Sequence, residues 1–230
     1  MRTRESLVRA AAEVFAEAGF APATISSICG RAGVSNGALH FHFESKRALA
    51  QAVEAAALDT VRRVTREADE RRGGPLQRLI DATHGLMSSL EEDVMVRAGL
   101  ALADTAPRPT GAVELRGEWL RWVDAVLRTA EREGRLAEGV RPAQVSNAVV
   151  AATVGFAVLG CGNPTWVSRR TLCRYWELML PRLAPPDALA QLVPQGTGPG
   201  VPGQVQHHPH HRASTRLRPG LRPRAALKDG

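Results

Sequence analysis

The spacing of apolar side chains constrains the fold of this chain more than any other feature. From residue 3 to about residue 184, apolar residues recur three and four positions apart, and sustained alternation of apolar and polar residues is confined to residues 39–43. A repeat of this kind places apolar side chains on one face of an α-helix, which has 3.6 residues per turn. We therefore predict an all-α protein.

Capping residues mark two short helices near the N-terminus. Thr24 and Ser35 are residue types that favour helix N-caps, and Gly33 between them suits a tight turn. Two short helices joined in this way form a helix-turn-helix, a motif of many DNA-binding proteins. A plain helical hairpin has the same pattern, so the caps alone leave both interpretations open. A first helix is predicted before these two helices, because apolar residues recur at helical spacing from Leu7 to Ala18 and Gly19 can end the helix. We assign residues 1–47 to this three-helix domain.

A long helix is predicted to follow the N-terminal domain. Ser45 is another favourable N-cap, and apolar residues continue at helical spacing to Ala68. The sequence RRGGP at 71–75 ends the helix, because two glycines and a proline do not continue a stable helix. Residues 48–72 are therefore expected to connect the two parts of the chain.

The stretch VSNGALHFHFESK at 34–46 alternates two histidines with two phenylalanines. As a β-strand it is too short, and helical patterns flank it on both sides. As a metal site it fails because His40 and His42 would lie about 200° apart around a helix, on opposite faces. As the second helix of a helix-turn-helix it fits, and we expect Phe41 and Phe43 to complete the core of the domain.

Residues 48–185 are predicted to form a helical ligand-binding and dimerisation domain. After the connecting helix, apolar periods predict further helices at 76–90, 94–103, 113–134, 142–160 and 168–183. The fourth of these is apolar on nearly every side, so it has to be buried. In a domain this small, such a helix and the one after it are often buried against their own copy. We therefore expect a homodimer.

The composition changes after residue 185. Pro, Gly, Gln, His and Arg dominate without an apolar period, so we predict that residues 186–230 form a disordered basic tail. Six basic and two acidic residues lie in 187–230, which gives this segment +4 of the net charge of +7. Overall charge is thus weak evidence for nucleic-acid binding. The HHPHH stretch at 207–211 has metal-binding residue types, but we expect no metal role for it.

Nothing in the sequence indicates export or a membrane span. The longest nearly unbroken apolar run, 148–161, has fourteen residues, whereas a spanning helix needs about twenty. No charged-then-apolar leader opens the chain. Its three cysteines are widely spaced and form no C-x-x-C pattern, so we predict neither a disulfide framework nor a zinc site. We expect a cytoplasmic protein.

The N-terminal fifty residues resemble the TetR family of transcriptional regulators. The stretch ATISSICGRAGVSNGALHFHFESKRALAQAV is similar to the family signature in the order of its capping, turn and aromatic positions. GALHFHF followed by ESK, together with MVRAGLALAD and GEWLRWVDAVLRTAEREGRL, resembles one branch more closely, the γ-butyrolactone receptors and pseudo-receptors of antibiotic-producing actinomycetes. The resemblance implies a homodimeric repressor that binds a palindromic operator and is released by a small ligand.

The resemblance also implies which residues contact DNA. By position they are Thr3, Arg4, Thr24, Ser35, Asn36, Gly37, His40 and Lys46. Lys46 starts the long helix, and we expect its ammonium to be free to meet a phosphate. Asn36 and His40 depart from the family, in which lysine and tyrosine are common at these positions. Loss of one cationic phosphate contact should make the plot of log binding constant against log salt concentration less steep, by about one unit of slope.

Trp119 matches the tryptophan that lines the ligand site in the relatives. Around it, Leu86, Met87, Leu90 and Val154 are expected to line an apolar cavity with few polar anchors. Such a cavity suits a small hydrophobic effector, for example a lactone, a furan or a flat antibiotic.

Two other functions remain open at this point. Asp81 and His84 share a helix face and form the one candidate catalytic pair, but pairs at this spacing are usually structural. We therefore expect no enzymatic activity and no cofactor. The second alternative is a DNA-binding regulator without a small-molecule ligand, whose C-terminal domain serves only dimerisation.

Overall fold

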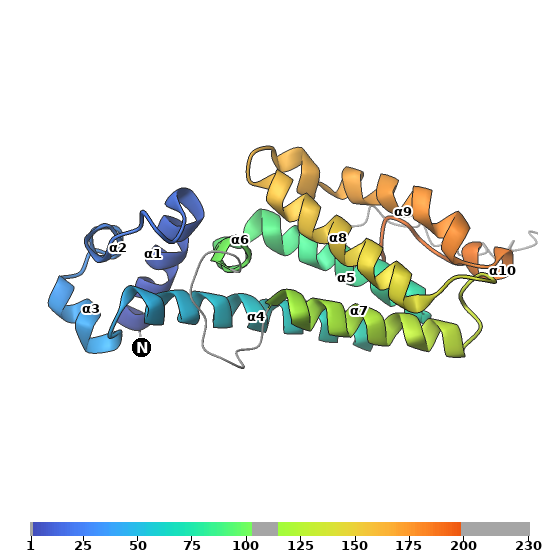
Figure 1. The fold of residues 1–230 in the computed structure, drawn as a ribbon, viewed down its shortest axis with the longest axis horizontal. Coiled ribbons are helices and arrows are strands. Elements are labelled where there is room, and N and C mark those ends of the chain that lie inside the picture. Colours follow the sequence, from blue (N-terminus) through green and yellow to red (C-terminus); the bar gives the residue numbers. More distant parts are fainter. Residues whose placement is uncertain (1, 103–114, 199–230) are drawn as a thin grey trace, which may run out of the picture.

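The computed structural model describes residues 2–102 and 115–198, which are helical and contain no β-strand. This confirms the all-α prediction. The elements are α1 (Arg2–Ala18), α2 (Ile25–Ala32), α3 (Asn36–His42), α4 (Lys46–Glu70), α5 (Pro75–Glu92), α6 (Val94–Leu102), α7 (Leu115–Arg132), α8 (Pro142–Gly160), the 3-10 helix η1 (Pro164–Val167), α9 (Arg169–Leu183) and α10 (Pro186–Leu189). Helices α1 to α3 lie at one end of an elongated molecule, and α4 leads from them to the remaining helices (Figure 1).

The N-terminal helices share a small hydrophobic core. Phe15 of α1, Ile28 of α2 and Leu39 of α3 are at most 1% exposed. The first half of α4 contributes to this core, and so do Ala98 and Leu102 of α6. The core therefore extends beyond the predicted boundary of the domain, because α6 returns to pack against it.

Helix α6 also packs very closely on α4. A Cβ atom placed on Gly99 of α6 would lie 2.4 Å from the Cβ of Ala57 on α4. No real side chain tolerates such a distance, so the approach of the two helices depends on glycine at this position. Helix α6 is thereby held against both the N-terminal helices and the connecting helix.

The C-terminal core is built by α5, α7, α8 and α9 together with the second half of α4. Trp176 of α9 is completely buried in it, and its indole N–H donates a hydrogen bond to the hydroxyl of Thr83 on α5, with an N···O distance of 2.8 Å. Large aromatic groups dominate the packing energy of such a core, and a buried indole N–H normally has an acceptor.

Three large apolar side chains of α8 and α9 are exposed in the single chain. Val158 and Leu159 of α8 are 59% and 47% exposed, and Leu178 of α9 is 76% exposed. The expectation that α8 is buried all round is thus not met within one chain. Among the described residues, α8 is also the one helix that is long and apolar enough to cross a membrane, which is weak evidence because core helices of soluble proteins share these properties.

Residues 186–198 are structured, which corrects the prediction of a disordered tail for this part of it. Helix α10 buries Ala188 against α9, and residues 193–198 return along α5. We call residues 193–198 the C-terminal strap. The predicted tail at 199–230, with its HHPHH stretch, lies outside the described residues.

Polar groups on α5 hold the strap in place. The side chain of Gln77 accepts a hydrogen bond from the Val193 N–H at 2.8 Å and donates one to the Val193 carbonyl at 3.3 Å. The carboxylate of Asp81 accepts from both the backbone N–H and the hydroxyl of Thr197. Hydrogen bonds to residues far away in the sequence order the strap. Its composition, with few apolar residues, therefore gives no sign that it is structured.

Candidate functional site

The helix-turn-helix has the predicted caps. The Thr24 hydroxyl accepts from the Ser27 N–H at 3.0 Å, and the Ser27 hydroxyl accepts from the Thr24 N–H in return, so α2 begins with a reciprocal capping box. Gly33 ends α2 with φ of 68°, a left-handed conformation that favours glycine. Ser35 caps α3 by accepting from the Ala38 N–H at 3.2 Å.

The residues implied to contact DNA occupy exposed positions, with Lys46 as the exception. Asn36, Gly37 and His40 of α3 are exposed, as are Thr3, Arg4, Thr24 and Ser35. The guanidinium carbon of Arg4 lies 5.1 Å from the centre of the Phe43 ring, which is a cation–π distance. The surface is therefore open to a partner, and contact of these residues with DNA stays a prediction.

The prediction that Phe41 belongs to the domain core is wrong. Phe41 is 85% exposed, whereas Phe43 is buried. Two residues that lie two positions apart on a helix point to nearly opposite sides. The rotation that separates His40 from His42 therefore also separates Phe41 from the buried Phe43. Applied to the phenylalanines, the same argument identifies Phe41 as a surface residue beside Asn36 and Gly37 on α3.

The prediction that the Lys46 ammonium is free is also wrong. Its Nζ donates hydrogen bonds to the carbonyls of Phe20, Ala21 and Ala23 at 2.9, 3.1 and 2.7 Å. It also lies 4.7 Å from the centre of the Phe20 ring. A lysine ammonium has three N–H donors, and all three are used. Lys46 thus ties the start of α4 to the loop between α1 and α2, a role that local sequence does not reveal.

Trp119 is a core residue of the C-terminal domain. It is 3% exposed, and its indole N–H donates to the hydroxyl of Thr153 on α8 at 3.0 Å. The Thr153 hydroxyl in turn donates to a backbone carbonyl of the preceding turn of α8. The ring of Trp122 stacks on Trp119 with centroids 5.5 Å apart. The Trp119 side chain is therefore held by a hydrogen bond to Thr153 and by stacking on Trp122.

Two adjoining apolar cavities lie beside Trp119. The inner cavity has a volume of about 20 Å³ and is lined by Leu86, Leu100, Leu115, Arg116, Trp119, Thr153 and Val154. The outer cavity has a volume of about 230 Å³ and is lined by Leu90, Arg97, Leu100, Ala101, Arg116, Val154, Ala157, Val158 and Cys161. The two share three lining residues, so a small displacement of side chains would join them.

The structure brings together four of the five predicted ligand residues. Leu86, Trp119 and Val154 line the inner cavity, and Leu90 lines the outer one with Val154. Met87 faces elsewhere, toward a separate polar cavity. One helical position separates Met87 from Leu86, and the resulting turn of about 100° sends the two side chains to different walls. The polar lining residues of the apolar cavities, such as Arg97, are missing from the prediction.

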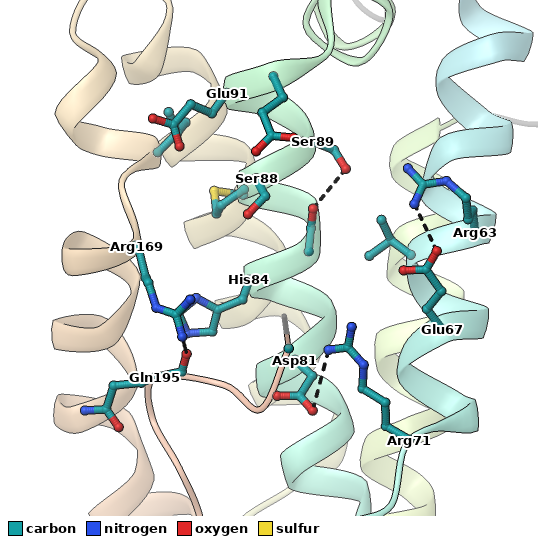
Figure 2. Close-up of a pocket in the computed structure, with 16 residues that line it drawn as sticks. Arg63, Glu67, Arg71, Asp81, His84, Ser88, Ser89, Glu91, Arg169 and Gln195 are labelled. Carbon is teal, nitrogen blue, oxygen red and sulfur yellow. Dashed lines mark hydrogen bonds and ion pairs between the residues drawn. The ribbon is translucent and has the colours of Figure 1, made fainter. Parts of the chain in front are cut away.

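A larger polar cavity of about 400 Å³ lies between α4, α5, the start of α9 and the C-terminal strap. Figure 2 shows Asp81 and His84 of α5 facing Arg169 and the strap on one side and Arg71 on the other. Its charged groups are partly paired: Arg63 with Glu67 at 3.0 Å and Arg71 with Asp81 at 3.9 Å. Among the described residues, no group of three His, Cys, Asp or Glu side chains is placed to hold a metal ion.

Asp81 and His84 hold the strap. His84 Nε2 lies 2.8 Å from the Pro194 carbonyl, an acceptor, so this nitrogen donates. Burial lowers the pKa of His84, while the contact with Pro194 acts in the opposite direction. A Cβ on Gly196 would lie 3.0 Å from the His84 ring, and φ of Gly196 is 74°, so the strap needs glycine here. The candidate catalytic pair is thus engaged in structural hydrogen bonds.

Comparison with known proteins agrees with this architecture. Residues 7–53 match the family model of the bacterial regulatory proteins of the tetR family. The A-factor receptor protein of Streptomyces griseus is 33% identical over 202 residues, which cover 85% of this chain and 69% of that protein. Its similarity therefore extends well beyond the helix-turn-helix.

Solved structures with the same fold include a γ-butyrolactone receptor and a TetR family protein bound to its operator. A γ-butyrolactone receptor described as ArpA-like has a TM-score of 0.72 at 27% identity and covers 83% of this chain and 91% of its own. The TetR family protein CprB from Streptomyces coelicolor, in complex with its operator sequence, has a TM-score of 0.73 at 28% identity and covers 83% and 92%. The chain thus belongs to the TetR family of bacterial DNA-binding regulators and is similar to the γ-butyrolactone receptors within it.

Proposed function

We propose that this protein is a ligand-responsive repressor that binds a palindromic operator as a homodimer and is released by a small hydrophobic effector. The position of α6 is the observation that carries this proposal. Ala98 and Leu102 of α6 belong to the core of the N-terminal domain. Arg97, Leu100 and Ala101 of the same helix line the outer cavity. One helix of nine residues therefore joins the ligand cavity to the DNA-binding end.

The leading end of α3 supports operator binding. In a helix-turn-helix, the first residues of the second helix reach base edges in the major groove. Asn36 and Gly37 occupy this place and are exposed. Phe41, on the same helix, adds an exposed apolar ring that suits contact with a thymine methyl or the sugar-phosphate backbone.

The exposed apolar side chains of α8 and α9 support a homodimer. Leu159 and Leu178 would be removed from water if these side chains met their own copies in a second chain, and burial of apolar surface is the main favourable term in such association. A two-fold dimer presents two α3 helices, and it binds two half-sites about one DNA turn apart, roughly 34 to 36 Å.

Release follows from a shift between two arrangements of the helices. A ligand that enlarges the inner and outer cavities pushes on α6, which is packed tightly against Ala57 of α4 through Gly99. Helices α4 and α6 both reach the core of the N-terminal domain, so the two α3 helices of the dimer change their separation. A displacement of a few ångströms prevents both from entering the groove together.

A mobility-shift assay on the upstream region of the gene tests this function, with and without an organic extract of the producing culture. The extract should release the unchanged protein. Val154→Phe, which places a ring in both cavities, should keep operator binding and resist release. Leu120→Phe adds the same ring on the outer face of α7 and serves as the matched control, which should respond like the unchanged protein.

Three outcomes separate the candidate functions. Release that the Val154→Phe variant resists supports the proposal. Operator binding that no extract disturbs points to the alternative, a DNA-binding regulator whose C-terminal domain serves only dimerisation. Failure of the unchanged protein to bind the upstream region rejects both. We further propose that the regulated genes serve secondary metabolism and that the protein acts in the cytoplasm, in line with the A-factor receptor similarity.

A further inference from the structure

The outer cavity combines an apolar wall with a cation. Leucine, valine and alanine side chains form most of its lining, and Arg97 of α6 and Arg116 of α7 lie among them. A purely apolar molecule would offer no acceptor to a guanidinium group at this wall, and a partly buried charge without enough partners is costly. The chemistry of this cavity therefore differs from that expected for an uncharged hydrophobic effector.

Arg97 is held in a fixed position. Its Nη1 donates to the carbonyls of Leu90 and Glu91, both at 2.9 Å, so the guanidinium group caps the C-terminal end of α5. Arginine carries five N–H donors in a rigid plane. The two carbonyls engage one nitrogen and fix the plane, and within residues 2–102 and 115–198 the Nε and Nη2 donors of Arg97 have no hydrogen-bond acceptor.

Arg97 has no carboxylate partner among residues 2–102 and 115–198. Two arginines of the polar cavity differ in this respect, since Arg63 pairs with Glu67 and Arg71 with Asp81 (Figure 2). A partly buried guanidinium without a counter-charge favours an anion, and its hydrogen bonds to a carboxylate are stronger than neutral ones. A ligand carboxylate at the outer cavity would supply this charge.

The two polar groups beside the Trp119 ring, its own indole N–H and the Thr153 hydroxyl, are already engaged. The indole N–H of Trp119 donates to Thr153, and the Thr153 hydroxyl donates to the carbonyls of Val149 and Val150. A ligand carbonyl placed beside Trp119 and Thr153 would therefore lose its hydration without gaining a hydrogen-bond donor from either group. The geometry places the apolar end of a ligand beside Trp119 and its polar end beside Arg97.

We propose that the effector is an amphipathic organic acid, whose apolar body fills the inner and outer cavities and whose carboxylate accepts hydrogen bonds from Arg97. This inference rests on the proposed function, because it assigns the ligand class of the same cavity. It adds the anionic group, which neither the apolar period of the sequence nor the position of Trp119 indicates.

Two probes of nearly equal shape test the charge. Naphthalene-2-carboxylate and naphthalene-2-carboxamide differ by one charge and both approach the size of the outer cavity. Isothermal titration calorimetry on the full-length protein should show the carboxylate binding about tenfold more tightly, the size expected from a hydrogen bond to a charged group. Arg97→Met should weaken the carboxylate about tenfold and change the carboxamide less than about twofold.

Matched variants keep the test decisive. Arg132→Met removes an exposed arginine of α7 that lies far along the helix from the cavity, and it should change neither affinity. Arg97→Lys keeps the charge but loses the planar fork, so it should fall between the unchanged protein and Arg97→Met. Because both probes are measured on every variant, a general loss of folded structure appears as an equal loss for both.

The outcomes distinguish this inference from the proposed function. Equal affinities of the two probes, or an equal effect of Arg97→Met on both, would overturn the acid and leave the cavity as a ligand site. If Val154→Phe changes the binding of neither probe, the probes do not use the cavity. That result would count against the proposed ligand site and against the acid together. Loss of carboxylate binding alone in Arg97→Met supports the inference.

Discussion

The candidate functional residues are exposed at the N-terminal end of this molecule and buried at the C-terminal end. In the N-terminal domain, Asn36, Gly37 and His40 lie on the surface of α3, outside the core that holds the helices together. In the C-terminal domain, Leu86 and Trp119 line the cavity and are 6% and 3% exposed, as members of the core itself.

At the N-terminal end, a substitution can therefore change binding without changing stability. At the C-terminal end, a substitution in the cavity changes both. A change at these positions of α3 should remove a proposed contact to DNA without opening a cavity, because the side chains are exposed in the described part of the chain. A change at the inner cavity alters the core that positions α6 and α4. The following experiments test this comparison.

The largest effect is expected for Trp119→Ala. Truncation of a buried tryptophan costs about 3 to 5 kcal/mol of the free energy of unfolding, since it opens a cavity and leaves Thr153 without its donor. Urea denaturation at fixed protein concentration measures this loss, with Leu120→Ala as the control on the exposed side of α7. A loss below about 1 kcal/mol would show that the ligand cavity is not part of the core.

This expectation changes the design of ligand experiments at Trp119. The alanine variant confounds ligand release with unfolding, whereas Trp119→Phe keeps a six-membered aromatic ring and makes a smaller truncation, which removes the five-membered ring together with the N–H that donates to Thr153.

Lys46→Met tests the comparison at the N-terminal end, where the ammonium serves stability although it lies close to the DNA-binding surface. Loss of hydrogen bonds from Lys46 to the carbonyls of Phe20, Ala21 and Ala23 should lower the free energy of unfolding by about 2 to 3 kcal/mol. Arg47→Met, at the exposed neighbouring position, should cost less than about 0.5 kcal/mol. If the Lys46→Met variant is as stable as the unchanged protein and its operator binding depends less on salt, Lys46 contacts a phosphate, as the sequence predicted.

Phe41→Ala tests the surface side directly. We expect the affinity for the operator to fall about tenfold, or about 1.4 kcal/mol, while the free energy of unfolding changes by less than about 0.5 kcal/mol. The Phe43→Ala control should instead lower stability by several kcal/mol, since Phe43 is 5% exposed. Mobility-shift titration and urea denaturation of both variants provide the measurements. Equal stability losses for the two variants would place Phe41 in the core after all.

His84 gives the smallest effect and concerns the C-terminal strap. Burial holds the pKa of His84 below its ordinary value of 6.5, helped by the charge of Arg169. The unfolded chain therefore binds a proton more readily than the folded one, and the free energy of unfolding should fall as the pH drops below about 6.5.

His84→Gln keeps a donor for the Pro194 carbonyl and loses the titration, so its stability should depend less on pH over this range. Thermal unfolding at a series of pH values compares the two proteins. Parallel pH profiles would show that His84 titrates normally in the folded state.

Local sequence predicted the helices and their ends well. Thr24, Ser35 and Ser45 cap α2, α3 and α4 through hydrogen bonds to residues three positions away. Such contacts lie within one turn, so the identities of a few neighbouring residues decide them. The caps and the glycine turn fitted a helix-turn-helix and a plain helical hairpin alike, and the resemblance to the TetR family favoured the helix-turn-helix, which the family match confirms.

The errors came from contacts between residues far apart. Lys46 bonds to carbonyls 23 to 26 positions earlier, and the strap residue Thr197 bonds to Asp81, 116 positions away. No spacing rule connects such residues. Phe41 differs, because helical rotation alone was sufficient to place it on the surface.

By itself, the sequence determined that the chain is helical, where its helices begin and end, and which short helix presents an exposed leading end, because period and capping act within one or two turns. The tertiary structure alone decided that Trp119 bonds to Thr153, that α6 serves both ends of the molecule, and that Arg97 lines an apolar cavity. These features depend on how separate helices pack in space, and packing brings together side chains whose distance along the chain carries no signal.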